Sequence, residues 1–306
     1  MKKLLICFLA LSLLMMIPFS ASAVDVYDSD GDYYLHEETG AIVPYRLVLP
    51  DGYDERYIFP LVVFFHGAGE RGMDNETQLA NCVQQIADNM PKAIILVPQC
   101  TGDNRWVDTD WGYGSYSTDE IPESDELQAV MALLEEIKTN YSVDKNTVYA
   151  AGISMGGYAV WDVMIRHNDV FAAGVAVCGA GDPSKAEILK DTPMFVYHGS
   201  HDDTVPPSGS TDMVQAIEAA GGTKVEYTEY GGAGHGIWGQ VFNQEKMYKA
   251  LRKCDLRDRY PEQPEPQQQD GFDVLTYLPY AGAAAGVIAI LAVVLVVLKK
   301  KKKKES

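Results

Sequence analysis

A serine between glycines, with aspartates and a histidine further along the chain, could carry out nucleophilic catalysis. The segment Gly152-Ile153-Ser154-Met155-Gly156 follows an apolar run and precedes a helix-like segment. Gly-x-Ser-x-Gly between a strand and a helix predicts a sharp turn that lifts the serine hydroxyl clear of the sheet. The glycines leave room for a strained backbone and for close approach of strand to helix. Ser154 is therefore the candidate nucleophile.

A serine hydroxyl is a weak nucleophile until a base takes its proton, and the base needs an acid that holds its tautomer. An apolar run at 193–197 is followed by His-Gly-Ser-His-Asp-Asp-Thr-Val-Pro, and a second run at 225–230 is followed by Gly-Gly-Ala-Gly-His-Gly. The order serine, aspartate, histidine, each after its own strand, suits this chemistry. We predict His235 as the base. Asp202 and Asp203 are both candidates for the acid, because adjacent carboxylates cannot be separated without geometry.

The elements that must position these residues alternate between strands and helices. The predicted strands are 42–49, 61–65, 93–97, 147–151, 173–177, 194–197 and 225–230. The predicted helices are 76–90, 124–140, 157–166, 212–220 and 238–254. Several strands are apolar throughout, as expected when both faces of a parallel sheet are covered. This pattern predicts an α/β fold with a mostly parallel, doubly wound sheet.

Four motifs, in this order, carry a resemblance that covers about residues 40–255. They are His-Gly-Ala-Gly-Glu-Arg-Gly at 66–72, Gly-Ile-Ser-Met-Gly-Gly at 152–157, His-Gly-x-x-Asp-x-x-Val-Pro at 198–206, and Gly-His at 234–235. The chain resembles the α/β-hydrolase superfamily, especially its secreted esterase branch. That branch includes feruloyl and acetylxylan esterases, polyhydroxybutyrate-depolymerase-like esterases and the catalytic domain of prolyl oligopeptidases.

The resemblance assigns a role to each matching position. It implies Ser154 as nucleophile, His235 as general base and Asp202 as the acid, with Asp203 as the alternative. The backbone N–H groups of Met155 and Ala68 would form the oxyanion hole. No cofactor or metal is implied.

Other residues near these motifs have weaker assignments. His66 is expected to brace the oxyanion loop, and His198 and His201 to support the turn at the acid. Glu70 and Arg71 could form an ion pair or be solvated. A long loop at 99–122 holds Trp106 and Trp111, which could stack on a sugar or aromatic acyl group or pack the loop onto the domain. Trp238 is expected to wall the pocket.

The two chain ends differ in composition from the rest. Residues 1–23 read as a signal peptide with a basic start, an apolar stretch and Ala-Ser-Ala before Val24. The catalytic domain is predicted at 24–258 and a Pro/Gln-rich stalk at 259–277. Residues 278–298 are predicted to span a membrane and 299–306 to form a lysine-rich cytoplasmic tail. The catalytic domain would then lie outside the cell, tethered by a single-pass helix.

The segment Leu278-Pro279-Tyr280-Ala281-Gly282 also resembles the sortase signal Leu-Pro-x-Thr-Gly, with alanine in place of threonine. Covalent attachment to the cell wall is therefore the alternative to a plain membrane anchor.

The charge and the cysteines bound the function further. The net charge is −18, which argues against nucleic acid or anionic lipid as partners. Cys82, Cys100, Cys178 and Cys254 remain after the predicted signal peptide and allow one or two disulfides, for example Cys82–Cys100. Cys178 ends an apolar strand and is expected to be a buried free thiol. No cysteine or histidine spacing indicates a metal site.

Together these features predict a cell-surface serine hydrolase that cleaves carboxylic esters, with acyl or feruloyl esters on polysaccharides as the favoured substrates. Sixteen residues separate the strands at 173–177 and 194–197, too few for an inserted helical lid, and an open cleft suits bulky esters. A peptidase acting on short peptides would share the same site. A non-catalytic binding protein on a hydrolase scaffold is the alternative of another class.

Overall fold

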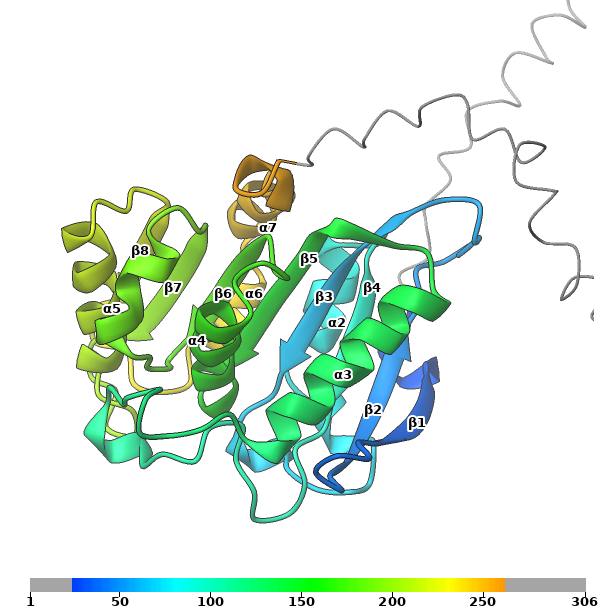
Figure 1. Cartoon of the computed structure of the whole chain (residues 1–306), viewed down its shortest axis with the longest axis horizontal. Coiled ribbons are helices and arrows are strands. Elements are labelled where there is room, and N and C mark those ends of the chain that lie inside the picture. The colour runs from blue at the N-terminus through cyan, green and yellow to red at the C-terminus, as the bar shows by residue number, and fades with distance from the viewer. Residues whose placement is uncertain (1–23, 262–306) are drawn as a thin grey trace, which may run out of the picture. The chain divides into compact units, whose positions relative to one another are not determined.

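The computed structural model describes residues 24–261, which are built around one eight-stranded sheet (Figure 1). Its order is β1-β2-β4-β3-β5-β6-β7-β8. The strands are β1 (Asp30–Leu35), β2 (Ile42–Val48), β3 (Phe59–Phe65), β4 (Ile94–Pro98), β5 (Val143–Ile153), β6 (Ala173–Val177), β7 (Met194–Gly199) and β8 (Val225–Tyr230). β2 pairs antiparallel with β1 and β4, and every pair from β4 to β8 is parallel. The prediction of a mostly parallel sheet is confirmed.

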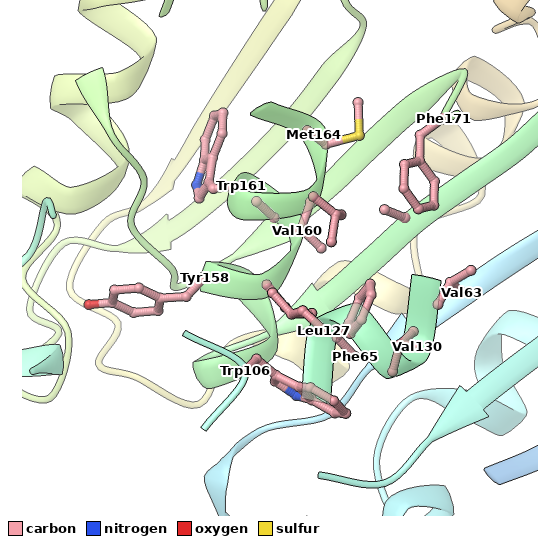
Figure 2. Packing of buried hydrophobic residues seen from close by; sticks show 14 of the residues in the cluster. Val63, Phe65, Trp106, Leu127, Val130, Tyr158, Val160, Trp161, Met164 and Phe171 are labelled. Carbon is pink, nitrogen blue, oxygen red and sulfur yellow. The ribbon is translucent and has the colours of Figure 1, made fainter. Parts of the chain in front are cut away.

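Helices cover both faces of this sheet. They are α2 (Val83–Asn89), α3 (Asp125–Asn140), α4 (Met155–Arg166), α5 (Ser208–Ala219), α6 (Trp238–Phe242) and α7 (Glu245–Leu251). α3, α4 and α5 contribute to the core on one face, which Figure 2 shows in part, whereas α2, α6 and α7 contribute to the core on the other. β3 serves both cores, because Val63 and Phe65 face the first and Val62 and Phe64 face the second. A strand covered on both sides has no polar face, which explains its unbroken apolar sequence.

Apart from shifted element ends, the structure differs from the predicted elements in three places. β1 was not among the predicted strands. Most of its residues are exposed, so its sequence lacks the apolar pattern of a buried strand, and it forms by pairing with β2 at the sheet edge. The predicted helix at 76–90 is a 3₁₀ turn (Thr77–Leu79) and α2, separated at Cys82, whose φ of 68° is not helical. The predicted helix at 238–254 is divided into α6 and α7. The backbone leaves the helical conformation at Cys82 and at Gln244, which the apolar periodicity of the sequence does not reveal.

The four cysteines of the described region are buried free thiols. The suggested Cys82–Cys100 disulfide is therefore wrong. Cys82 belongs to the core beside α2, and Cys100 belongs to the core on the opposite face of the sheet. The expectation of a free buried thiol at Cys178 is confirmed.

Between residues 24 and 261, no helix combines the length and apolar character needed to cross a bilayer. The predicted signal peptide (1–23), spanning segment (278–298) and tail (299–306), and all but the first residues of the predicted stalk, lie outside the described residues. Between β6 and β7, residues 178–193 are all described and contain one 3₁₀ helix (Pro183–Leu189), with no inserted helical domain.

Candidate active site

Ser154 lies on a strained turn between β5 and α4. Its φ of 53° and ψ of −120° fall where residues other than glycine are rarely found. A hydrogen bond of 2.8 Å from its N–H to the carbonyl oxygen of Val177 helps to hold the turn. A Cβ on Gly156 would overlap the carbonyl oxygen of Phe65, and one on Gly152 would overlap that of Gly156. The glycines of the motif are therefore required by the close contact of β3, β5 and α4.

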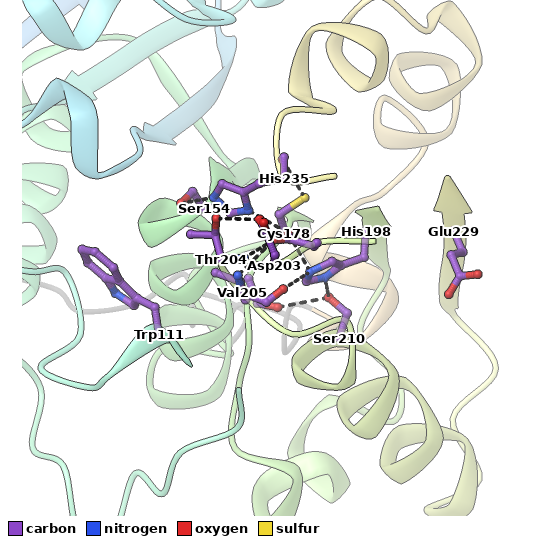
Figure 3. Close-up of polar contacts among 12 residues, drawn as sticks. Trp111, Ser154, Cys178, His198, Asp203, Thr204, Val205, Ser210, Glu229 and His235 are labelled. Carbon is purple, nitrogen blue, oxygen red and sulfur yellow. Dashed lines mark hydrogen bonds and ion pairs between the residues drawn. The ribbon is translucent and has the colours of Figure 1, made fainter. Parts of the chain in front are cut away.

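Loops after β7 and β8 bring two further side chains to this turn, and Figure 3 shows one of them, His235, beside Ser154. Ser154 Oγ lies 2.7 Å from Nε2 of His235, and His235 Nδ1 lies 2.7 Å from Oδ2 of Asp202. Asp203 is exposed, and its carboxylate contacts the hydroxyl of Thr204 at 3.5 Å. The structure therefore joins Asp202, and not Asp203, to the histidine.

Asp202 is held as a carboxylate. Its side chain is fully buried, which by itself opposes ionisation. Hydrogen bonds from His198, His235 and the backbone N–H groups of Val205 and Thr204 more than offset this penalty and hold the pKa of Asp202 well below its ordinary value. An acceptor of this kind keeps a proton on Nδ1 of His235 and leaves Nε2 free to accept one from Ser154.

Two helices begin beside Ser154, and the backbone N–H group of the first residue of each is available to a ligand. Met155 is the first residue of α4 and Ala68 the first of a 3₁₀ helix (Ala68–Glu70), so neither N–H has a partner within its own helix. Gly67 brings the second helix close, because a Cβ there would lie 3.5 Å from that of Ser154. Ala68 also lines the same pocket as Ser154. The arrangement can therefore stabilise a negatively charged oxygen at this opening.

The opening is a pocket of about 290 Å³. Its lining residues are Gly67, Ala68, Gly69, Glu70, Trp111, Ile153, Ser154, Thr204, His235 and Trp238. Trp238 meets the His235 ring edge-on, with centroids 5.4 Å apart. Trp111 forms another part of the wall, with the Arg105 guanidinium 4.6 Å from its ring centroid. Both tryptophans thus line the pocket that contains Ser154, and their contact with a substrate stays a prediction.

Trp106 does not line this pocket, and its predicted contact with a substrate is wrong. Its indole is fully buried, packs edge-on against Phe65 and donates a 3.1 Å hydrogen bond to the carbonyl oxygen of His66. Because β3 ends at this point, the loop residue completes the core beneath the site and cannot reach the pocket.

His66 braces the loop that carries Ala68, as expected. Its Nε2 accepts the N–H of Cys100 at 2.9 Å, so Nδ1 carries the proton and donates to the carbonyl oxygen of Gly67 at 2.6 Å. Burial lowers the pKa of His66 to about 4. The imidazole is therefore neutral in the folded protein at neutral pH.

This burial predicts an acid-sensitive fold. Between pH 6.5 and 4 the unfolded chain binds a proton at His66 that the folded chain excludes, so the free energy of unfolding falls as the pH is lowered, by about 3 kcal/mol from this residue. Urea unfolding at a series of pH values measures the slope. His66→Gln should flatten it, whereas Ser208→Ala, which removes an exposed hydroxyl that does not titrate, should not. An unchanged slope in His66→Gln would contradict the assignment.

The pocket also contains Glu70, whose role the sequence left open. Glu70 does not pair with Arg71, whose guanidinium donates instead to the carbonyl oxygen of Ala68 at 2.9 Å. Its Oε1 accepts a 2.6 Å hydrogen bond from Asn81, and Oε2 lies 3.1 Å from the position of a Cβ on Gly67. The same position is 3.5 Å from the Cβ of Ser154. In the sequence, the position of Glu70 two residues after Ala68 was the feature that could have indicated its place beside Ser154.

One group in the described region has the chemistry of metal ligands. The side chains of Cys178, Asp202 and His235 place their ligand atoms within 4.8 Å of one another. However, Asp202 and His235 are hydrogen-bonded to each other, and burial raises the pKa of the Cys178 thiol to about 12. These atoms are better suited to a proton relay than to a cation.

A parallel sheet with helices on both faces, and a serine on the tight turn between a central strand and its helix, defines an α/β-hydrolase. The serine, histidine and aspartate occur in the chain order of that class.

The chain belongs to the "Putative esterase" family, whose profile matches residues 37–268. The predicted membership of the α/β-hydrolase esterases is thereby confirmed, and the family is one of hydrolases that act on carboxylic esters.

Several similar proteins are esterases as well. A thermostable esterase of known structure is 31% identical, with a TM-score of 0.66 over 75% of this chain and 64% of that one. A CE1 ferulic acid esterase from Anaeromyces mucronatus shares the fold, at 15% identity and a TM-score of 0.54 over 76% of this chain and 92% of that one. The bifunctional acetylxylan esterase/xylanase XynS20E of Neocallimastix patriciarum is 23% identical over 48% of this chain, which spans only 20% of that protein.

Proposed function

We propose that this protein is a serine esterase that works through an acyl-enzyme. The observation that carries the proposal is the chain of 2.7 Å hydrogen bonds from Ser154 through His235 to the buried Asp202. Ser154 is the nucleophile, His235 the general base, and Asp202 orients the imidazole. The N–H groups of Ala68 and Met155 form the oxyanion hole.

Each step moves one proton and exchanges one bond. Ser154 Oγ bonds to the ester carbonyl carbon as its proton passes to Nε2 of His235, and the carbonyl oxygen takes the negative charge. Collapse of this intermediate breaks the bond to the alcohol, which leaves with the proton from His235. A water molecule then attacks the acyl-enzyme in the same way and releases the acid.

The favoured substrates are acyl or feruloyl esters on polysaccharides. Trp111 and Trp238 provide aromatic surface beside Ser154, which suits a sugar ring or an aromatic acyl group. Oε2 of Glu70 has no hydrogen-bond partner within residues 24–261 and can accept a sugar hydroxyl. The similarity to an acetylxylan esterase and a ferulic acid esterase agrees with this choice.

A panel of matched substrates tests the proposal. The kcat/KM values for acetyl and feruloyl esters of a xylo-oligosaccharide should exceed those for proline-linked aminoacyl amides. Faster cleavage of the amides would make the protein a peptidase, which shares the same residues. A fluorophosphonate probe should label Ser154 covalently, and absence of labelling would favour a non-catalytic binding protein.

We also propose that the catalytic domain is exported and tethered by the segment at 278–298, on the strength of its sequence alone. Fractionation of the source cells should recover the protein with membranes, in a form that external protease can cut. Release from the cell only by wall-degrading enzymes would instead indicate sortase attachment at Leu278–Gly282.

A further inference from the structure

Glu70 is the one acidic residue that lines the catalytic pocket in the described part of the chain, and the catalytic steps above do not use it. Asp202 contacts the far nitrogen of His235, is fully buried and does not line the pocket. Oε2 of Glu70 lies 3.1 Å, and Cβ of Ser154 3.5 Å, from the same point, the position of a Cβ on Gly67. The carboxylate is therefore within reach of a substituent on an ester bound at Ser154.

Three hydrogen bonds fix Glu70 in place. Its N–H donates to the carbonyl oxygen of Gly67 at 3.3 Å, and its carbonyl oxygen accepts a 3.1 Å bond from Nε2 of the fully buried Gln99. Its Oε1 accepts a 2.6 Å bond from Nδ2 of Asn81. Oε2 has no hydrogen-bond partner among the described residues and is left to meet a ligand. A side chain that is already held in this way loses little conformational freedom when a substrate binds.

The nearby guanidinium groups do not take up this carboxylate. Arg71 lies 5.9 Å and Arg105 4.6 Å from the centroid of the Trp111 ring, and neither arginine lines the pocket. Both donate hydrogen bonds to backbone carbonyl oxygens. Among the described residues, neither forms an ion pair with Glu70. A substrate in the pocket therefore meets the carboxylate of Glu70, with the two cations outside the pocket lining.

We propose that Glu70 is a specificity-determining residue, which selects neutral, hydroxyl-bearing esters and rejects esters that carry a carboxylate near the carbonyl group. This inference deepens the proposed function and rests on it. A carboxylate accepts hydrogen bonds and donates none, so Oε2 of Glu70 can accept a bond from a substrate hydroxyl. A substrate carboxylate in the same place would be repelled, and it would lose its water shell without gaining a donor.

Glu70→Gln tests the role of the charge. The amide keeps the size of the side chain and an oxygen for Asn81, and it removes the negative charge. Two series of esters vary the groups near the carbonyl. The acyl series consists of p-nitrophenyl butyrate, β-hydroxybutyrate and hemisuccinate, and the alcohol series consists of the acetates of propanol, glycerol and β-hydroxypropionic acid. Each series has a neutral, a hydroxyl-bearing and an anionic member.

We expect the kcat/KM ratio of the neutral to the anionic ester to fall about tenfold in Glu70→Gln relative to the wild type, in the series whose substituent faces Glu70. Two charges a few ångströms apart repel by at least this factor at an effective dielectric constant of about 20. The ratio of the hydroxyl-bearing to the neutral ester should fall about threefold, because a hydrogen bond to a carboxylate is stronger than one to a neutral group. The control Glu76→Gln removes an exposed carboxylate outside the pocket lining and should leave both ratios unchanged.

A change in these ratios separates selection of the substrate from support of the loop. Loss of a merely structural contact would lower all the rates together and leave the ratios as they are. Unchanged ratios in both series, with turnover that depends on Ser154, would overturn this inference alone. If Glu70→Gln does not fold, Glu70→Ala supplies the same ratios. Turnover of none of the esters by the wild type would contradict the proposed function, and this inference with it.

Discussion

Ser154→Ala should reduce kcat for short p-nitrophenyl esters by about 10⁴- to 10⁶-fold, with little change in the melting temperature. The substitution removes the atom that bonds to the carbonyl carbon. The N–H groups of Ala68 and Met155 remain, because they belong to the backbone, so a small residual rate over water is expected. Steady-state kinetics and fluorophosphonate labelling measure the two consequences, loss of turnover and loss of the covalent adduct.

The control for this variant is Ser208→Ala, which removes an exposed hydroxyl at the start of α5. It should retain wild-type kinetics and labelling. Full activity of Ser154→Ala on the same esters would exclude the proposed mechanism, since no other hydroxyl contacts His235 Nε2 in residues 24–261.

The second large effect is expected at Asp202. Asp202→Asn should lower kcat by about 10⁴-fold, because an amide that donates to Nδ1 of His235 stabilises the wrong tautomer of the imidazole. Binding should change much less, since the buried side chain does not line the pocket. Determination of kcat and KM for the ester panel separates these two effects.

The adjacent carboxylate provides a matched control of the same chemistry and charge. Asp203→Asn should stay within about twofold of the wild type, because this exposed side chain makes no contact with His235. A loss in Asp203→Asn as large as that in Asp202→Asn would mean that the aspartates exchange roles, and a loss below tenfold in Asp202→Asn would remove the carboxylate from the mechanism.

The sequence by itself determined the α/β fold, the turn at Ser154 and the order of the site residues. These features have local causes. Apolar strands alternate with amphipathic helices along the chain, and glycines at 152 and 156 are needed wherever a strand and a helix meet so closely. Strand ends in a parallel sheet share one edge, so loops that follow β5, β7 and β8 had to meet there.

Only the tertiary structure decided which side chains point where. Two adjacent aspartates have the same residue type, and which of them meets His235 depends on a loop that is distant in sequence. The same is true of Trp106, whose burial depends on the end of β3, and of Cys82 and Cys100, which the sheet separates. A short polar strand such as β1 forms only because β2 is there to pair with it. Burial and hydrogen bonding between distant segments arise only in the folded chain, so they cannot be predicted from a local sequence pattern.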